Sequence, residues 1–304
     1  MISIVVCHRN PKFLEQFKKS VSDTIGIPYE IVIIDNITNK YNIFQAYNEG
    51  IKQSKYDLIC FAHEDIIFHS NNWGEKVISH FKNPKIGIIG VVGSHYLPKL
   101  PGSHWSTQIS SGNITHTING KTQPLFSRYL DNKESSVQAV ILDGLWLCIS
   151  RTVIKRIRFD DAKFSGFHCY DSDICLQIKK LNYEVHVIFD LNIEHLSVGK
   201  RDVTWLNNIF YLYNKWEKEL PICTIELSKQ EISWAHFLNA QELIEQIRLN
   251  KLGLLYIIKT WVYYLSCNPP ITKMNWILTL RLFNERLYFI LSRLKQKIKI
   301  TWQN

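Results

Sequence analysis

Residues 56–68 read Tyr56-Asp-Leu-Ile-Cys-Phe-Ala-His-Glu-Asp-Ile-Ile-Phe68, and their order of apolar and polar side chains indicates the fold. The apolar run 58–62 has the length of a buried β-strand, and three polar residues follow it at once. Two earlier apolar runs end in the same way, one before His8-Arg9-Asn10 and one before Asp35-Asn36. The pattern is typical of strands that carry functional side chains just beyond their ends.

Strand-like and helix-like segments alternate through the first third of the chain. Strand-like apolar runs cover 2–7, 29–34, 58–62 and 86–92, and segments with helical apolar spacing cover 11–24, 43–53 and 73–81. Such alternation predicts βαβ units, and therefore an α/β fold with a mostly parallel sheet and flanking helices. Because ligands bind beyond the carboxyl ends of parallel strands, we expect the polar residues after the first three strands to share one edge of the sheet.

Two common classes of nucleotide-binding motif are absent. No GxxxxGKS/T occurs, and Gly87, Gly90 and Gly93 are spaced by threes and do not form GxGxxG, so P-loop ATPases and Rossmann dehydrogenases lose support. The seven cysteines form no CxxC pair, which indicates reduced thiols and argues against a disulfide frame or a zinc site. The first apolar run is too short for a signal peptide, so we expect a cytoplasmic protein.

Residues 94–136 are rich in Ser, Gly, Asn, Thr and Pro and interrupt the alternating pattern. An excursion of this length is either disordered or an active-site lid, and four aromatic residues favour a binding loop: Tyr96, Trp105, Phe126 and Tyr129. Strand-like runs follow at 137–142, 145–149 and 183–189, and a helix is expected to begin near Asp171. From Trp205 to the end the pattern is helical, with a break at 268–270.

His63-Glu64-Asp65 places acidic groups at the end of a buried strand. Hard divalent cations bind carboxylate oxygens and share them with phosphates, so a turn of this kind suits a metal site. An ordinary polar turn explains the tripeptide equally well. On these residues the two interpretations stay open.

Four segments, taken in order, resemble family 2 glycosyltransferases with the GT-A fold, in particular a bacterial branch that carries a histidine in its DxD-type metal motif. They are Ser3-Ile-Val-Val-Cys-His-Arg-Asn10, Glu30-Ile-Val-Ile-Ile-Asp-Asn36, Ala46-Tyr-Asn-Glu-Gly50 and the stretch from Tyr56 to Asp65. The resemblance covers about residues 1–220 and implies a GT-A catalytic domain there. Residues 221–304 are left as a helical, basic C-terminal segment.

The resemblance implies a nucleotide diphosphate sugar as donor and assigns residues to its site. Asp65 falls on the last aspartate of the DxD motif and would bind Mn²⁺ or Mg²⁺, while His63 stands where the first aspartate is usual. His195 occupies a position where the family often has a histidine that reaches the metal or the diphosphate, although a lone histidine is more often structural. The remaining donor-side residues are Cys7, His8, Arg9, Asp35, Asn48, Glu64 and Lys200.

Residues 167–176 resemble the segment in which this family carries its catalytic base, usually an acid pair before a helix. Asp171 aligns with the base, Tyr170 replaces the customary glutamate, and Asp173 is the alternative base. A carboxylate there would accept the proton that an acceptor hydroxyl loses as it attacks the anomeric carbon, in a direct displacement that inverts this carbon. Without the resemblance, Asp171 is better explained as a helix cap.

Asp143-Gly144 resembles the acidic position that the family has on the side of the sugar and the acceptor. Trp146 follows it in the chain and is a candidate for stacking on a sugar ring. A place in the core explains Trp146 equally well.

The net charge of +9 lies in the C-terminal segment, since residues 248–304 contain ten Lys and Arg against one acid, Glu285. Over 276–300 apolar residues recur at helical spacing among basic ones, which suits the surface of an anionic membrane. The apolar run 252–266 is too short to span a membrane. Packing on the catalytic domain and a homo-oligomer contact are the alternatives, and no recognised nucleic-acid-binding module accompanies the charge.

The sequence therefore predicts an inverting, hexosyltransferase-type glycosyltransferase, peripheral at the inner face of the membrane. Its acceptor would be a surface glycan or a lipid-linked precursor of lipopolysaccharide or capsule type, and a UDP-sugar is the donor that the resemblance favours. Two other interpretations remain. A sugar-phosphate nucleotidyltransferase would be expected to show a Gly-rich loop after the first strand, and a degenerate transferase domain would only bind glycan or scaffold an assembly.

Overall fold

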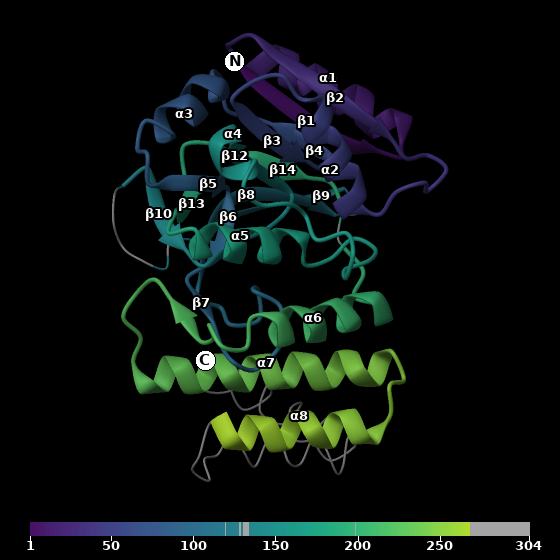
Figure 1. Cartoon of the computed structure of the whole chain (residues 1–304), viewed down its shortest axis with the longest axis vertical. Coiled ribbons are helices and arrows are strands. Elements are labelled where there is room, and N and C mark those ends of the chain that lie inside the picture. The colour runs from purple at the N-terminus through teal and green to yellow at the C-terminus, as the bar shows by residue number, and fades with distance from the viewer. Residues whose placement is uncertain (119, 128, 130–133, 198, 268–304) are drawn as a thin grey trace, which may run out of the picture.

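The computed structural model describes residues 1–304 apart from 119, 128, 130–133, 198 and 268–304. Its centre is a seven-stranded sheet in the order β10-β13-β5-β12-β3-β1-β2 (Figure 1). The strands are β1 (Ile2–His8), β2 (Tyr29–Asp35), β3 (Leu58–Ala62), β5 (Ile86–Gly90), β10 (Ser136–Ala139), β12 (Trp146–Ser150) and β13 (Glu184–Ile188).

The direction of these strands follows from their pairing. β1 is parallel to both β2 and β3, and β13 is parallel to β5. β12 is antiparallel to both β3 and β5, and β10 is antiparallel to β13, so five of the seven strands run in one direction. The predicted α/β fold with a mostly parallel sheet is confirmed.

Helices connect the parallel strands, and polar side chains cap the starts of the first two. α1 (Pro11–Thr24) starts behind Asn10, whose side chain accepts a hydrogen bond from the N–H of Lys12 at 3.0 Å. α2 (Ile43–Gln53) starts with a capping box. Gly50 lets α2 lie close to β1, since a Cβ there would stand 2.1 Å from a methyl group of Val5. α3 (Trp73–His80), α4 (Arg151–Ile154) and α5 (Tyr170–Lys180) complete this part of the fold.

A second sheet of six strands contains much of the segment 94–136. Its order is β11-β6-β8-β14-β4, with β9 paired to β8, and the bounds are β4 (Ile66–Phe68), β6 (Val92–Ser94), β8 (Ser110–Ile118), β9 (Lys121–Ser127), β11 (Ile141–Leu142) and β14 (Ile193–His195). The segment 94–136, expected as a long binding loop, is partly sheet, because β8 and β9 form a hairpin within it. Every residue of β9 is exposed, so the hairpin lacks the apolar alternation that would predict it.

The second sheet brings together parts of the chain that are distant in sequence. β14 lies between β4 and β8, antiparallel to the first and parallel to the second. In this register His195 is opposite Ile66 on one side and His116 on the other. Asp65, which directly precedes β4, is therefore close to His195.

Two predicted strands are each divided between the sheets. The run 86–92 splits into β5 and β6, and the run 137–142 splits into β10 and β11. Each division leaves one residue between the two strands, Val91 in the first case and Val140 in the second. Both valines are buried, so the apolar pattern continues from one sheet to the next. The division into two strands therefore cannot be predicted from this pattern.

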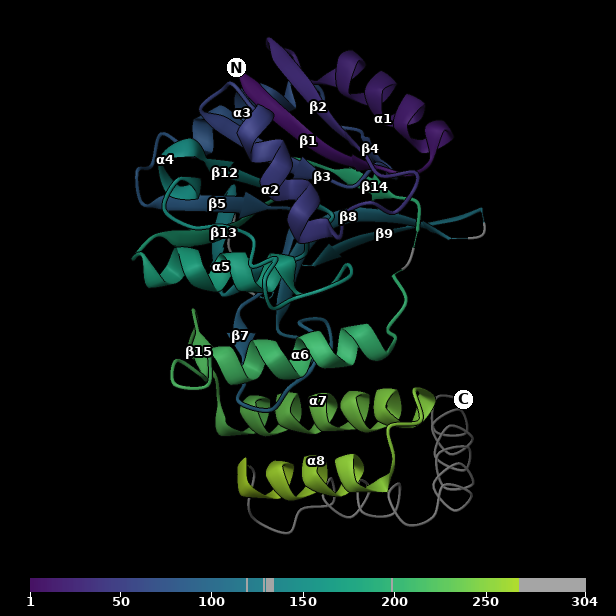
Figure 2. The ribbon, with the colours of Figure 1, turned by 45° about the vertical axis from the view of Figure 1, so that its right-hand side comes forward.

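Three helices stack in order away from the main sheet, as two views agree (Figures 1 and 2): α6 (Val203–Lys215), α7 (Lys229–Leu249) and α8 (Leu254–Cys267). Their residues Leu206, Leu243 and Tyr264 belong to the same hydrophobic core as Phe61 of β3. A short strand, β15 (Ile222–Cys223), also pairs with β7 (Tyr96–Leu97). The described part of the C-terminal segment therefore packs on the α/β unit.

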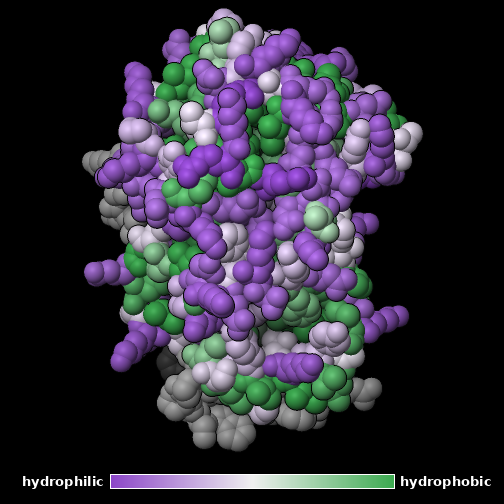
Figure 3. Space-filling view, in the orientation of Figure 1, coloured by the Kyte–Doolittle hydropathy of each residue, from purple (hydrophilic) through white to green (hydrophobic). Residues whose placement is uncertain are grey.

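Large apolar side chains are exposed along α8: Leu254, Leu255, Tyr256, Ile258, Val262 and Tyr263. Hydrophobic residues gather at this end of the molecule in the space-filling view (Figure 3). Among the described residues, no helix combines the length and the apolar character needed to cross a membrane. The amphipathic helix predicted over 276–300 lies outside the described residues.

Candidate active site

A cavity of about 1100 Å³ opens at the carboxyl ends of β1 and β3. Its wall includes residues from each of the three polar strand ends, among them Arg9, Asn36 and Asp65. The expectation that these strand ends share one edge of the sheet is confirmed. The rest of the wall includes residues of the loops 102–105 and 143–144, of the start of α5, and of α6.

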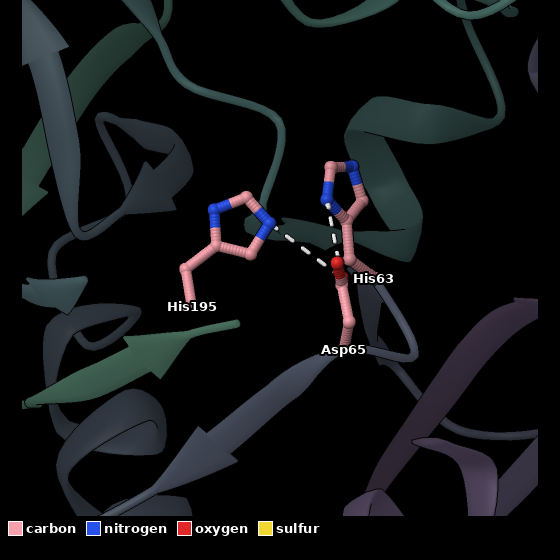
Figure 4. A group of neighbouring side chains, drawn as sticks. All are labelled: His63, Asp65 and His195. Carbon is pink, nitrogen blue, oxygen red and sulfur yellow. Dashed lines mark ion pairs between the residues drawn. The ribbon is translucent and has the colours of Figure 1, made fainter. Parts of the chain in front are cut away.

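On the wall of this cavity, Asp65 lies between two imidazole rings, and both rings point a nitrogen at its carboxylate (Figure 4). Oδ1 of Asp65 is 3.9 Å from Nδ1 of His63 and 3.5 Å from Nε2 of His195. One ligand atom of each residue lies within 4.8 Å of the other two. A hydrogen bond of 3.0 Å from the N–H of Leu196 to the carbonyl oxygen of Asp65 holds the two segments together.

The surroundings keep His63 neutral and Asp65 ionised. Burial, aided by the nearby His195, lowers the pKa of His63 to about 4. Burial by itself would raise the pKa of Asp65, but the imidazoles of His195 and His63 bring it well below its usual range. For His195 burial is outweighed by Asp65, which raises the pKa of the imidazole.

These three residues fit a divalent cation. A neutral imidazole and an ionised carboxylate are the protonation states that metal binding requires. Nε2 of His195 is buried, and within the described residues its one polar contact is the 3.5 Å ion pair with Asp65, which is long for a hydrogen bond and leaves the nitrogen able to bind a further group. Two imidazoles beside one carboxylate suit Mn²⁺ better than Mg²⁺, which prefers oxygen ligands.

Two further residues border this group. The ring of His116, in β8, has its centroid 5.6 Å from that of His195, and its buried Nδ1 has no hydrogen-bond partner within the described part of the chain. Oη of Tyr170 lies 2.7 Å from Nε2 of His63. No sequence motif pointed to His116, because it lies in a polar hairpin.

Asp143 and Asp171 lie on the wall of the same cavity. Gly144 joins them, since it follows Asp143 in the chain and its N–H donates to Oδ2 of Asp171 at 3.0 Å. Oδ2 of Asp143 accepts from Nε1–H of Trp105 at 3.0 Å and lies 3.3 Å from Nε2 of His104. Trp105 was expected in a binding loop, whereas the sequence carried no signal for His104.

The two acids differ in strength because their partners differ. Burial raises the pKa of Asp171 to about 6. Burial acts on Asp143 in the same direction, but the adjacent His104 brings the pKa of Asp143 well below its usual range. The interaction is mutual, since Asp143 raises the pKa of His104 against the effect of burial. One carboxyl group of the cavity is thus a weak acid and the other a strong one, a pattern found where two acids take different roles.

Glu64 shapes the end of β1. Its carboxylate accepts a hydrogen bond of 2.9 Å from Nδ1 of His8, and it also accepts from the backbone N–H groups of Arg9 and Asn10 at 3.0 to 3.1 Å. His8 is buried against Glu64 and lies outside the cavity wall, whereas Cys7 and Arg9 are part of it. The structure therefore places His8 behind the site and Glu64 between it and the cavity.

A family model described as "Glycosyltransferase like family" matches residues 3–220. The chain belongs to this family. The predicted resemblance to family 2 glycosyltransferases with the GT-A fold is thereby confirmed. No curated protein sequence matches this member of the family.

Solved structures with a similar fold include GalNAc-T7 with UDP, GalNAc and Mn2+, at a TM-score of 0.52 and 11% identity. The match covers 96% of this glycosyltransferase-like chain and 57% of GalNAc-T7, so the chain spans little more than half of that protein's length. S. aureus TarS in complex with UDP-GlcNAc matches at a TM-score of 0.48 and 13% identity over 92% of this chain and 86% of that chain. The mannosyltransferase PcManGT from Pyrobaculum calidifontis, in complex with GDP-Man and Mn2+, matches at a TM-score of 0.47 and 10% identity. This match covers 98% of this chain and 80% of that chain.

Three predicted site residues of this glycosyltransferase-like protein do not line the cavity, and their side chains are engaged elsewhere. Trp146 is fully buried and packs edge-on against Trp73, so it has no face for a sugar ring. The amide of Asn48 is held at both ends by the backbone of Phe159. Asp173 is 1% exposed, and its carboxylate accepts from Nζ of Lys215 and Nε1 of Trp216, each at 2.8 Å.

Asp35 and Lys200 are exposed residues outside the cavity wall. Asp35 accepts a hydrogen bond from the N–H of Ile37 at 3.1 Å, and its neighbour Asn36 lines the cavity. Arg201, the neighbour of Lys200, lines it as well. Contacts from Asp35 and Lys200 to a nucleotide stay predictions.

Proposed function

We propose that this protein is an inverting glycosyltransferase that transfers a sugar from a nucleotide diphosphate, with a UDP-sugar favoured, to a hydroxyl group of a surface glycan or lipid-linked acceptor. The observation that carries the proposal is the shared cavity of Asp171 and of Asp65 with its two histidines. At about 1100 Å³ the cavity is slightly larger than most small-molecule sites, which suits a nucleotide sugar together with part of an acceptor.

In this proposal His63, Asp65 and His195 hold a divalent cation, for which the donor atoms favour Mn²⁺. Such a cation, when bound, offsets the negative charge that builds on a departing diphosphate. Arg9 contributes a further positive charge on the cavity wall, where a guanidinium group can bind phosphate oxygens through two N–H donors. Cys7 and Asn36 line the neighbouring part of the wall, and this end of the cavity is assigned to the nucleotide.

Asp171 is the general base. With a pKa of about 6 it is mostly ionised at neutral pH, and it holds a proton more firmly than an ordinary aspartate does. It takes the proton of the acceptor hydroxyl as that oxygen bonds to the anomeric carbon. The bond from this carbon to the diphosphate breaks on the opposite face, so the configuration inverts.

Asp143 is less suited to be the base, because its low pKa makes it a poor proton acceptor. Its carboxylate is held in place by Trp105 and His104 and remains an anion on the cavity wall. We assign it to hydrogen bonds from sugar hydroxyl groups. This assignment is supported by its position one residue from Gly144, the residue that holds Asp171.

The division of the chain is also part of the proposal. Residues 1–220 are the catalytic unit, which the family match to 3–220 supports. Residues 221–304 are assigned to the inner face of a membrane. The support is the positive charge of residues 248–304 together with exposed apolar side chains on α8, such as Leu255 at 62% and Val262 at 54% exposure.

Co-sedimentation with vesicles tests the membrane assignment. We expect binding to vesicles that contain anionic lipid and release at high salt, and weaker binding for the double variant Leu255→Ser, Val262→Ser. A protein that fails to bind such vesicles contradicts the assignment. If the same double variant converts a dimer to a monomer in ultracentrifugation, the face is an oligomer contact.

Calorimetric titration tests the catalytic proposal. We expect UDP to bind in the presence of Mn²⁺, and Asp65→Ala to lose this metal-dependent binding. Asp23→Ala, which removes an exposed acid on α1, serves as the matched control and is expected to bind as the wild type does. Absence of binding for UDP, GDP and CMP alike would sink the proposal and favour a degenerate domain that scaffolds an assembly.

A further inference from the structure

Two side chains on the wall of the cavity, His63 and Tyr170, are in direct contact, since Nε2 of His63 lies 2.7 Å from Oη of Tyr170. They occupy the positions at which the resemblance implies an aspartate and a glutamate. Tyr170 is 2% exposed, in the first turn of α5. The contact is therefore partly shielded from water, which strengthens a hydrogen bond.

The Tyr170 hydroxyl has a second partner, and this partner decides where the protons lie. Oη of Tyr170 is 2.8 Å from the carbonyl oxygen of Gly144, which can only accept a hydrogen bond. A tyrosine hydroxyl carries a single hydrogen, so that hydrogen goes to Gly144. Nε2 of His63 must then be the donor in its contact with Oη, which makes the imidazole the Nε2–H tautomer.

The other nitrogen of His63 is left with a lone pair. Nδ1 is 3.9 Å from Oδ1 of Asp65, which is too long for a hydrogen bond, so nothing in that contact calls for a proton on Nδ1. The lone pair is directed toward Asp65 and the space shared with His195 (Figure 4). A metal ligand needs this arrangement, with one imidazole nitrogen bare and the other held by a hydrogen bond.

We propose that Tyr170 is a positioning residue that fixes the Nε2–H tautomer of His63 and so presents the Nδ1 lone pair to a divalent cation. The inference rests on the proposed function, since it concerns the same metal site. A glutamate at 170 would also accept from Nε2–H, but its carboxylate has no hydrogen to donate to Gly144. A tyrosine satisfies both neighbours.

Gly144 also helps to keep the Tyr170 hydroxyl in its position. A Cβ at this position would stand 2.1 Å from Oη of Tyr170, so a side chain there would push the hydroxyl away from both of its partners. The N–H of Gly144 meanwhile donates to Asp171. The metal group and the proposed base are thus connected through Tyr170 and one glycine.

The ¹⁵N chemical shifts of the ring nitrogens measure the tautomer of His63 directly. The ¹⁵N chemical shifts of the metal-free protein, labelled at histidine and assigned with His63→Gln, distinguish a protonated ring nitrogen from a bare one. We expect Nε2 of His63 to be protonated and Nδ1 bare in the wild type, and a mixture of tautomers in Tyr170→Phe. Mn²⁺ titration of the same samples should show about 10- to 100-fold weaker binding for Tyr170→Phe.

Tyr213→Phe is the matched control. Tyr213 also lies on the cavity wall, and its buried hydroxyl makes no hydrogen bond with the described residues. Its removal is expected to leave both the tautomer of His63 and the affinity for Mn²⁺ unchanged. Thermal unfolding of both variants shows whether the ring and its packing are kept.

Two outcomes overturn the inference. One is a proton on Nδ1 of His63 in the wild type, a measurement that needs no substitution and holds even if Tyr170→Phe fails to fold. The other is a folded Tyr170→Phe with the wild-type tautomer and wild-type affinity for Mn²⁺. If the wild type does not bind Mn²⁺ at all, the proposed function fails, while the tautomer measurement still decides the role of Tyr170.

Discussion

The backbone N–H of Gly144 donates a hydrogen bond of 3.0 Å to Oδ2 of Asp171, which joins the loop after β11 to the first turn of α5. Asp171 therefore has a defined position at the cavity wall although its carboxyl group is buried and a weak acid. The N–H of Ser172 holds its other oxygen at 2.7 Å. A carboxylate held in this way is oriented before an acceptor binds, which is what a general base requires.

Replacing this carboxylate should remove catalysis and spare binding. We expect Asp171→Asn to lower kcat by about 10²- to 10⁴-fold, the usual contribution of a general base, and to leave metal-dependent UDP binding unchanged. Initial rates and calorimetry on one preparation measure both quantities. A rate close to that of the wild type would mean that another group takes the proton.

The pH dependence of the rate should report the same group. Because Asp171 has to be ionised to accept a proton, kcat of the wild type should rise with pH through a limb near pH 6. The residual activity of Asp171→Asn should lack this limb. A limb of the same position in the variant would assign it to a different residue.

The free energy of unfolding should also depend on pH through Asp171, but it should fall with rising pH where kcat rises. Since burial raises the pKa of Asp171 to about 6 from 3.8, the folded protein binds this proton more tightly than the unfolded chain does. The resulting stabilisation is present below pH 4 and is lost as the pH rises through 6. Urea unfolding at several pH values should show this loss in the wild type and a flatter profile in Asp171→Asn.

The histidines beside Asp65 should contribute to metal affinity. We expect His195→Gln to weaken Mn²⁺ binding, because it removes a ring nitrogen that lies 3.5 Å from Oδ1 of Asp65. His186→Gln, in β13 and bonded to Glu184, is the matched control and should bind Mn²⁺ as the wild type does. Electron paramagnetic resonance of free Mn²⁺ gives both affinities, and equal values would remove His195 from the site.

Asp173 should matter for stability and not for metal binding. Asp173→Ala leaves Lys215 with Asp160 as its remaining carboxylate partner, but it removes the acceptor of the buried Trp216 indole N–H, and an unsatisfied buried donor costs about 1 to 3 kcal/mol. Asp161→Ala removes a carboxylate from an ion pair with the exposed Arg158 and should change the free energy of unfolding by about 0.5 kcal/mol or less. Denaturant unfolding of both variants, with Mn²⁺ titration of each, separates the structural role from a role in the site.

The contrast between Asp171 and Asp173 shows where prediction from the sequence ends. Both acids lie in one motif, and the sequence offered both as the base. Two residues apart on an α-helix, their side chains point to nearly opposite faces, since each residue advances the helix by about 100°. Only the placement of α5 decided that Asp171 faces the cavity and that Asp173 faces α6.

The sequence by itself determined the alternating strands and helices, the polar strand ends and the family, because these depend on the local order of apolar and polar residues. The resemblance to the family, and not this order alone, predicted Asp65 and Asp171 at one site. The neighbours of these two acids were decided by the tertiary structure alone: β14 pairs between β4 and β8 and brings His195 and His116 together, and the loop before β8 carries His104 to Asp143. Contacts of this kind join residues far apart in the chain, and no periodicity in the sequence records which strand pairs with which.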